Sequence, residues 1–470
     1  MAGRKQQPYT TLEERRASGR QARERSPRSG HTGWTPADDR PDPIGILEAQ
    51  DATREPDLVP VRHGRMAVSP FTFYRGGAAI MAADLSATPR AGLDVQICGD
   101  AHLSNFGAFA SPERDLLFDL NDFDETLTGP FEFDVERLAA SFVIAGRNNG
   151  FPEADSKLAA QTSVRAYRET IAAFSTMGTL DIWYAKLPAD RLADLIRSSG
   201  RKVGRKSQER LDKTLAKTRT RDTMQAVAKL TERVDGARRI VSQPPIVVPM
   251  RDLLQVYGLS PDDVDTVVRD QFRAYKATLP PDRRLLLERF RFVDLARKVV
   301  GVGSVGTRAF IALFEGRDGD DPLFLQVKEA TSSVFEAYLR PSRYRHHGER
   351  VVNGQRLMQA ASDIMLGWTK GLDQDRHFYW RQLRDMKGSF EVESSIPSGL
   401  VDYAQICGWT LARAHARSGD PVAITAYLGK SDTFDRAMTD FARRYADQNE
   451  KDYAAFTKAI KSGKLEATEG

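Results

Sequence analysis

The feature that most constrains this chain is a pair of short acidic segments, each of which directly follows a run of apolar residues. The first, GDAHLSN at residues 99–105, follows LDVQIC, and the second, DLNDFD at residues 119–124, follows LLF. Short apolar runs bounded by turn formers are typical of strands. We therefore expect both acidic segments to lie at strand ends, where a fold can bring polar side chains together.

Helices are predicted on both sides of these acidic turns. Residues 69–85 (SPFTFYRGGAAIMAADL) predict a helix that packs through its aromatic and aliphatic side chains and places Arg75 near the first turn. Residues 131–142 (FEFDVERLAASF) predict a second helix, which begins near Asp134. Both assignments depend on apolar residues spaced by three and four positions.

The chain divides into five regions by composition and periodicity. Residues 1–60, rich in Arg, Pro, Asp and Gly and without an apolar signal segment, predict a disordered basic tail and linker. Residues 61–150 hold the acidic turns, and residues 151–290 are predicted to be mainly helical. Residues 291–390 are β-rich, and residues 391–470 return to helical spacing.

A basic stretch lies within the predicted helical region. Residues 201–240 carry 13 Lys or Arg against 5 Asp or Glu, in a chain whose net charge is only +5. Apolar residues at steps of three and four predict a pair of basic amphipathic helices here. The stretch lacks the interleaved aromatic side chains on which bases stack, so nucleic-acid binding is not expected.

Residues 291–390 predict a small antiparallel sheet. Two short apolar runs, residues 309–314 and 323–328, are separated by a Gly- and Asp-rich loop and predict a hairpin. A later strand pair, whose second member is residues 378–383, completes the sheet. With helices on either side in sequence, the expected fold class is α+β, with a small antiparallel β lobe and a mainly helical lobe.

Composition restricts the location of the protein. No run approaches the roughly 20 apolar residues that cross a bilayer, so no membrane span is expected. The only cysteines are Cys98 and Cys407, too few for a disulfide framework. Both observations predict a cytoplasmic protein.

The acidic turns contain the residue types that phosphoryl transfer requires. Asp100 could orient or deprotonate an acceptor hydroxyl, while Asn105 and Asp122 could hold Mg²⁺ through their oxygen atoms. Positioning and charge neutralisation supply most of the rate in such reactions. His102 is interpreted as a histidine that bonds the loop backbone.

A glycine motif and a lysine in the β-rich region predict contacts with phosphate groups. Gly301, Gly303 and Gly306 match G-x-G-x-x-G, and the strand-like run that follows them favours a loop folded over phosphates rather than the helix start of a dinucleotide-binding unit. Lys328 ends a predicted strand, from which its ammonium could reach a triphosphate. Glu336, on a helix predicted to start near Thr331, and Glu349 are both candidates for its carboxylate partner.

These motifs resemble a known superfamily of kinases. Residues 100–105 (DAHLSN) look like the catalytic loop of aminoglycoside phosphotransferases and other small-molecule kinases, in which a metal-binding asparagine follows the aspartate by five residues. Residues 122–124 (DFD) resemble the metal-binding turn of that superfamily, and Asp134 falls where a structural aspartate is expected. Residues 301–306 and Lys328 resemble its nucleotide-binding lobe.

The resemblance extends to a hinge-like segment, but the order of the motifs differs. Residues 379–383 (YWRQL) look like a hinge, which implies that Gln382 and Leu383 contact a nucleotide. Kinases run from glycine loop to lysine, hinge, catalytic loop and metal aspartate, whereas here the last two come about 200 residues before the first. A circular permutation would reconcile the orders, and coincidence is the other explanation.

More specifically, residues 60–455 resemble the bacterial domain-of-unknown-function family 2252. The resemblance rests on PFTFYRGGAAIMAADL, CGDAHLSNFG, FDLNDFDET, FEFDVERLAASF, VGVGSVGTR and LARAHARSGD. It implies a kinase-like fold and covers most of the chain.

The function expected from these motifs is ATP- and Mg²⁺-dependent phosphotransfer to a hydroxyl or amine of a small-molecule or protein acceptor. A non-catalytic nucleotide-binding or scaffold protein is the main alternative, and AMP transfer would use the same parts. Gly99, Asp100 and His102 also resemble part of a metallophosphoesterase site. A two-metal hydrolase would need more ligands than the chain supplies, since it has seven histidines and no second such cluster.

Overall fold

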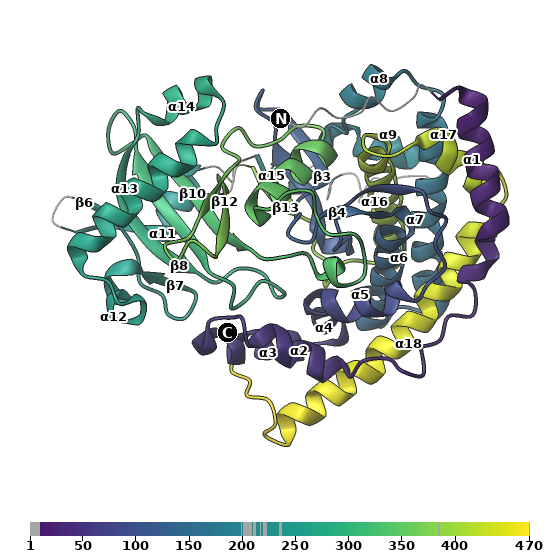
Figure 1. Cartoon of the computed structure of the whole chain (residues 1–470), viewed down its shortest axis with the longest axis horizontal. Coiled ribbons are helices and arrows are strands. Elements are labelled where there is room, and N and C mark those ends of the chain that lie inside the picture. The colour runs from purple at the N-terminus through teal and green to yellow at the C-terminus, as the bar shows by residue number, and fades with distance from the viewer. Residues whose placement is uncertain are drawn as a thin grey trace.

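A computed structural model describes residues 10–198, 200, 209, 213–216, 218–219, 223–234, 237–383 and 386–469. It has a mixed α+β fold in which a strand-rich part lies beside a larger helical part (Figure 1). All strand pairs in the described sheets are antiparallel, as the sequence predicts. No helix among the described residues is long and apolar enough to span a membrane.

The largest sheet has six strands in the order β11-β12-β10-β9-β8-β7. Its strands are β7 (Val247–Pro249), β8 (Arg291–Lys298), β9 (Ala309–Glu315), β10 (Pro322–Ala330), β11 (Gly367–Lys370) and β12 (His377–Gln382). The predicted hairpin is confirmed as β9 and β10, and the predicted later strand pair as β11 and β12. The sheet also includes β7, which precedes the region predicted to be β-rich.

Both faces of this sheet are covered, which explains why β9 is apolar at consecutive positions. Alternate side chains of a strand point to opposite faces, and Ala312 and Phe314 belong to one hydrophobic cluster while Ile311 and Leu313 belong to another. The first cluster includes aromatic residues of α13 (Pro261–Ala277), among them Phe272, whose ring stacks on Phe314 with centroids 4.7 Å apart. The second includes residues of α11 (Thr223–Leu230).

The helical part is built around α7 and α16, which pack along each other (Figure 1). Its main helices are α6 (Phe131–Asn148), α7 (Glu153–Phe174), α16 (Pro397–Ala416), α17 (Pro421–Leu428) and α18 (Thr433–Lys461). One hydrophobic core extends from these helices to the strands that follow and precede the acidic turns. The strands that lead into and out of the acidic turns therefore belong to the same hydrophobic core as the helices.

The prediction of a disordered tail over residues 1–60 is wrong from residue 10 onward, while residues 1–9 lie outside the described part. Helix α1 (Leu12–Arg25) begins with a capping box at Thr11 and packs on α17, and α2 (Pro43–Asp51) follows. Arg40 forms ion pairs of 2.6 Å with both Asp84 and Asp452. The acidic partners of this basic segment lie far along the chain, so local composition could not reveal them.

Three other expectations are corrected. Residues 231–240, predicted to be helical, form the hairpin of β5 (Thr231–Val234) and β6 (Ala237–Ile240), whose Ile240 amide donates a hydrogen bond to the Asp294 carboxylate. Half of the basic stretch before it, in which a pair of basic amphipathic helices was predicted, lies outside the described residues. The helix predicted over 69–85 is two helices, α4 (Pro70–Gly76) and α5 (Ala78–Ser86), and α6 begins at Phe131 rather than near Asp134.

Short strands carry the acidic turns. Strand β1 (Asp94–Ile97) pairs with β4 (Leu127–Pro130), and β2 (Phe106–Ala110) pairs with β3 (Leu116–Leu120) and with β13 (Gly388–Ser389). The first acidic turn follows β1 and the second follows β3, as predicted.

The remaining elements are short helices. They are η1 (Arg28–His31), η2 (Pro56–Leu58), α3 (Val59–Ala67), η3 (Leu103–Asn105), α8 (Thr179–Tyr184), η4 (Ala189–Arg191), α9 (Leu192–Ser198), η5 (Met250–Asp252), α12 (Leu254–Tyr257), α14 (Pro281–Leu287), η6 (Val334–Ala337) and α15 (His347–Met358).

Candidate functional site

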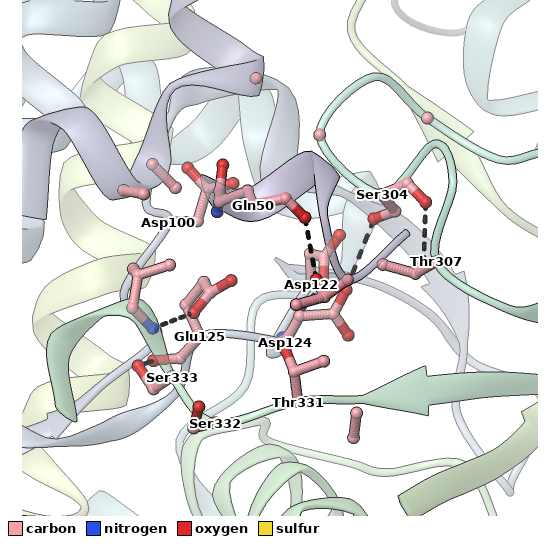
Figure 2. A pocket seen from close by; sticks show the side chains of 18 of the residues that line it. Gln50, Asp100, Asp122, Asp124, Glu125, Ser304, Thr307, Thr331, Ser332 and Ser333 are labelled. Carbon is pink, nitrogen blue, oxygen red and sulfur yellow. Dashed lines mark hydrogen bonds between the residues drawn. The ribbon is translucent and has the colours of Figure 1, made fainter. Parts of the chain in front are cut away.

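The two acidic turns meet at one cavity (Figure 2). In the β2–β3 hairpin Phe106 is opposite Leu120, so the residues just outside the hairpin also face each other. The amide of Asn121 donates a hydrogen bond of 2.8 Å to the carbonyl of Asn105. This register places Asn105 and Asp122, predicted to hold metal, at the same end of one hairpin.

The turn after β1 requires glycine at position 99. Gly99 has φ of +79°, a conformation that side chains disfavour, and a Cβ there would lie 2.4 Å from the Glu125 carbonyl oxygen. The close approach brings the first acidic turn directly against the second. Gly99 thus fixes the direction in which the chain leaves β1 toward Asp100.

Asp134 holds the backbone of this turn. Its carboxylate accepts hydrogen bonds from the amides of Cys98 at 2.8 Å and Gly99 at 3.0 Å, and it lies 3.1 Å from Nε2 of His415. Asp134 is almost fully buried in the first turn of α6. Since charge-assisted hydrogen bonds are stronger than neutral ones, the turn is anchored to the helical core.

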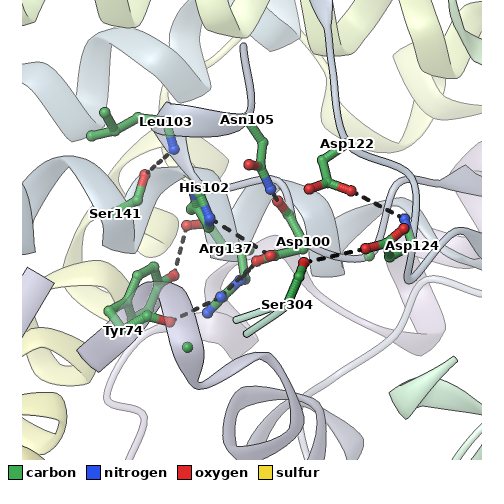
Figure 3. A network of polar contacts seen from close by, with 12 residues as sticks. Tyr74, Asp100, His102, Leu103, Asn105, Asp122, Asp124, Arg137, Ser141 and Ser304 are labelled. Carbon is green, nitrogen blue, oxygen red and sulfur yellow. Dashed lines mark hydrogen bonds and ion pairs between the residues drawn. The ribbon is translucent and has the colours of Figure 1, made fainter. Parts of the chain in front are cut away.

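Asp100 is paired with Arg137, a residue that the sequence did not reveal as part of the site (Figure 3). The Arg137 guanidinium lies 2.6 Å from the Asp100 carboxylate, donates to the Tyr74 carbonyl at 3.0 Å, and stacks on the Tyr74 ring. Burial raises the pKa of Asp100, and Arg137 opposes this shift without cancelling it. Arg137 follows Asp134 by three positions on α6, so one helix orients both the turn and its aspartate.

His102 lies 3.6 Å from the Asp100 carboxylate through Nε2. Burial, together with the charges of Arg75 and Arg137, lowers the pKa of His102 well below its usual value. A neutral imidazole beside Asp100 therefore adds no charge to the site.

Asn105 and Asp122 have the donor atoms and charge state that suit Mg²⁺. The Asn105 side-chain nitrogen donates to the Asp100 carbonyl at 2.7 Å, which leaves its side-chain oxygen toward the cavity that it lines. Burial alone would raise the pKa of Asp122, but Lys328, Arg381 and Lys387 lower it, so the carboxylate is ionised. Carboxylate and amide oxygens are hard ligands, and Mg²⁺ commonly takes only one or two carboxylates together with phosphate oxygens and water.

No group of three or more His, Cys, Asp or Glu suited to a metal occurs among the residues described. The Asp122 carboxylate and the Asn105 amide oxygen are a donor set that suits a metal which takes its other ligands from phosphates and water.

Lys328 on β10 reaches the second acidic turn. Its ammonium forms an ion pair with Asp124, which also accepts a hydrogen bond of 2.8 Å from the Tyr379 hydroxyl. Burial alone would lower the pKa of Lys328, but Asp122 and Asp124 raise it above its usual value. The lysine is cationic and lies 3% exposed between the sheet and the turn.

The expected partners of Lys328 were wrong. Glu336 belongs to η6 and not to an α-helix starting near Thr331, and its carboxylate accepts the amides of Ser333 and Ser342. Neither Glu336 nor Glu349 pairs with Lys328 within the part of the chain that the structure describes. Asp124 takes that place because the sheet packs over the acidic turn.

The glycine motif forms the loop between β8 and β9, so the helix of a dinucleotide-binding unit is excluded here. Gly301 and Gly303 line the cavity together with Ser304, whose hydroxyl lies 3.5 Å from the Asp124 carboxylate. A Cβ on Gly303 would lie 3.1 Å from the Arg75 carbonyl oxygen. Gly306, with φ of +88°, instead packs against Arg54.

Two adjoining cavities share the acidic turn and the glycine loop. The larger, of about 710 Å³, is lined by Asp100, Asp124 and Glu125 (Figure 2) and also by Asn105. The smaller, of about 430 Å³, is lined by Lys328 and by the hinge-like Gln382 and Leu383. The residues common to both are Asp122, Gly301 and Ser304.

The predicted site residues therefore fall on two sides of one junction. Asp100 and Asn105 face the larger cavity, Lys328, Gln382 and Leu383 face the smaller cavity, and Asp122 lies between them. Both volumes lie in the range of small-ligand sites. The geometry therefore consists of two adjoining cavities with the Asp122 carboxylate at their boundary.

The chain belongs to the family of uncharacterised proteins conserved in bacteria, DUF2252, whose profile it matches over residues 54–459. No curated protein and no solved structure matches the chain.

Proposed function

We propose that this protein is an ATP- and Mg²⁺-dependent phosphotransferase with a kinase-like, circularly permuted arrangement of its motifs. The proposal rests on the contact between Lys328 and the acidic turn that contains Asp122 and Asp124. These groups come from motif sets that lie about 200 residues apart in sequence.

The smaller cavity suits the nucleotide. Gln382 and Leu383 lie at the end of β12, where a base would sit, and Lys328, Arg381 and Lys298 supply positive charge for phosphates. Asn105 and Asp122 would hold Mg²⁺, which neutralises charge that develops on the phosphoryl group. Gly301 and Ser304 lie at the boundary, where the terminal phosphate would enter the larger cavity.

The larger cavity suits the acceptor. Asp100 lines it and can accept the proton of an acceptor hydroxyl or amine as the new bond to phosphorus forms and the bond to ADP breaks. Arg137 orients this carboxylate. A general base is effective only where such positioning is fixed in advance.

The proposal is tested by thermal unfolding of the wild type, Lys328→Ala and Asp122→Asn with and without ATP and Mg²⁺. A ligand that binds only the native state raises the unfolding temperature by mass action. We expect a magnesium-dependent rise in the wild type that both variants lose. A folded wild type that shows no rise at millimolar ATP would refute the proposal.

A second candidate is nucleotide binding without transfer. The observation in its favour is the ion pair of 2.6 Å between Asp100 and Arg137, which engages the proposed base. The two candidates differ in an assay with γ-labelled ATP and a panel of hydroxyl and amine acceptors. Label transfer that is lost in Asp100→Asn, in a variant that still binds ATP, would favour the transferase.

A further inference from the structure

The larger cavity contains two arginines, Arg54 and Arg75, that the proposed transfer does not use. Arg75 lies at the end of α4, and Arg54 lies just after α2. The Nε atoms of both are buried and have no hydrogen-bond partner among the described residues. A buried polar atom without a partner is costly, and a ligand or a water molecule that supplies the partner removes this cost.

Several of the carboxylates that line the same cavity are already paired with other cations, whereas Asp122 and Glu125 have no ion pair among the described residues. Asp100 pairs with Arg137, and Asp124 pairs with Lys328. Glu329 lies 3.3 Å from Arg308 and 3.5 Å from Arg376. These acids therefore do not neutralise Arg54 and Arg75 at contact distance.

The side chain of Arg75 makes no hydrogen bond or ion pair within the described part of the chain. Burial lowers the pKa of its guanidinium, while Asp100, Glu393 and Asp122 oppose this effect without reaching contact distance. A cation held in this way gains stability from an anion that enters the cavity.

Arg54 is in a similar position. Its guanidinium donates one hydrogen bond to the Val305 carbonyl, and Asp51, its nearest carboxylate partner, is 3.9 Å away. Asp51 itself is bound by Arg62 at 2.6 Å and by His63 at 2.8 Å. Burial and the charge of Arg62 lower the pKa of Arg54 to about 9.

The phosphates of a nucleotide do not need these two arginines. The smaller cavity has its own cationic lining, which consists of Arg114, Lys298, Lys328, Arg381 and Lys387. Arg54 and Arg75 line only the larger cavity, which Asp100 also lines.

We propose that the larger cavity takes a small acceptor that carries an anionic group, a phosphate or a carboxylate, bound by Arg75 and Arg54 while its hydroxyl faces Asp100. This inference rests on the proposed function, because it treats the larger cavity as the acceptor site. The guanidinium group presents several N–H donors in one plane, a geometry that matches phosphate and carboxylate oxygens. A volume of about 710 Å³ accommodates a small molecule of this kind.

The test uses the full chain with its nucleotide site filled by Mg²⁺ and a non-hydrolysable ATP analogue. Inorganic phosphate and, in a separate arm, malonate are titrated, and the unfolding temperature is followed in the wild type, Arg75→Gln and Arg90→Gln. Arg90 is a matched control, because it is a partly buried arginine that donates to the Ser86 carbonyl and lines neither cavity.

We expect at least one of the two anions to raise the unfolding temperature of the wild type and of Arg90→Gln. The loss of one charged hydrogen-bonding partner should weaken the apparent anion affinity of Arg75→Gln by about 10- to 100-fold. The arm that gives the larger shift identifies phosphate or carboxylate as the preferred group.

Two results would overturn the inference: no anion-dependent shift in the nucleotide-filled wild type, or equal shifts in the wild type and Arg75→Gln. Failure of the proposed function would be seen differently, as no response to ATP and Mg²⁺. The protein could also respond to the anion through Arg75 while showing no response to ATP and Mg²⁺. That result would support the anion site and reject its place beside a nucleotide.

Discussion

The ammonium of Lys328 donates a hydrogen bond to the carboxylate of Asp124, which lies 204 residues earlier in the chain. The other oxygen of Asp124 accepts from the Tyr379 hydroxyl at 2.8 Å, so β10 and β12 both contact the second acidic turn. The pair joins the sheet to the β2–β3 hairpin at the boundary of the two cavities. The relative placement of Lys328 and Asp122 depends on it.

The first prediction concerns the stability of this pair. Lys328→Met leaves the Asp124 carboxylate without its cation, and removal of one member of a largely buried pair costs roughly 3–5 kcal/mol. In the double variant Lys328→Met/Asp124→Asn the unpaired charge is gone, so the loss in unfolding free energy should be smaller than the sum of the two single losses. Urea denaturation of the four proteins measures this coupling.

Tyr379→Phe is the control for the cycle. It removes one hydrogen bond to Asp124 and keeps the ion pair, so we expect a loss of about 1 kcal/mol. Additive effects of the Lys328 and Asp124 substitutions would show that the pair contributes nothing specific.

The second prediction compares two glycines with similar backbone angles. Gly92 and Gly99 have φ of +73° and +79°, but a Cβ would meet nothing within 4 Å at Gly92 and would lie 2.4 Å from the Glu125 carbonyl oxygen at Gly99. Gly92→Ala should therefore lower the unfolding free energy only by the cost of holding alanine in a left-handed backbone conformation, about 1–2 kcal/mol. Gly99→Ala should lower the unfolding free energy further and should also weaken the proposed binding of ATP, because the acidic turns must separate.

Unfolding free energies and ATP-dependent shifts of the two variants provide the measurement. Equal losses of stability in Gly92→Ala and Gly99→Ala would show that contact between the two turns is not required.

The third prediction concerns Asp134. In Asp134→Asn the carboxylate that accepts hydrogen bonds from the Cys98 and Gly99 amides loses its charge, so these bonds become weaker. The side-chain NH₂ group of asparagine also points at one of these two N–H donors and cannot accept from it. We expect a loss of about 2–3 kcal/mol in unfolding free energy. Asp115→Asn is a suitable control, since its ion pair with Lys186 has side chains 54% and 44% exposed and should contribute less than about 1 kcal/mol. Similar small effects in both variants would show that Asp134 does not anchor the turn.

The positions of the site residues along the chain could be predicted because their causes are local. Apolar residues before Gly99 and Asn121 form β1 and β3, and strand alternation places Lys328 within an antiparallel hairpin. Polar residues that follow such strands fall at strand ends whatever the rest of the fold does. This local logic sufficed to place Asp100, Asn105 and Asp122 beside strand ends. Lys328, which was predicted to end its strand, instead lies two residues before the end of β10.

The partners of these residues could not be predicted, because they come from distant segments. The candidates for pairing with Lys328 were the nearby Glu336 and Glu349, whereas Asp124 precedes it by 204 residues. Arg137 was not recognised because it lies in α6, a helix whose residues are mostly buried in the core. The N-terminal helices were missed for the same reason, since Arg15 pairs with Asp420 at the other end of the chain.

The last prediction concerns pH and a group of histidines at the start of α15. The rings of His346 and His377 stack with centroids 4.0 Å apart, and the His347 amide donates to His377. Burial lowers the pKa of His346 to about 4, and His377, His347 and Lys370 add to this effect while the Thr369 backbone opposes it. His346 therefore takes up its proton less readily in the folded chain than in the unfolded chain, whose ordinary value is about 6.5.

Because the unfolded chain binds this proton more readily, stability should fall as the pH drops from about 6.5 to about 4. His346→Asn removes the titrating group but keeps a side chain that can accept the Glu349 amide at the helix start, as His346 does at 3.3 Å. We expect the variant to lose less of its unfolding free energy than the wild type over this pH range. Urea denaturation at pH 7 and pH 4.5 measures the difference, and parallel losses in the two proteins would exclude His346 as a source of the acid sensitivity.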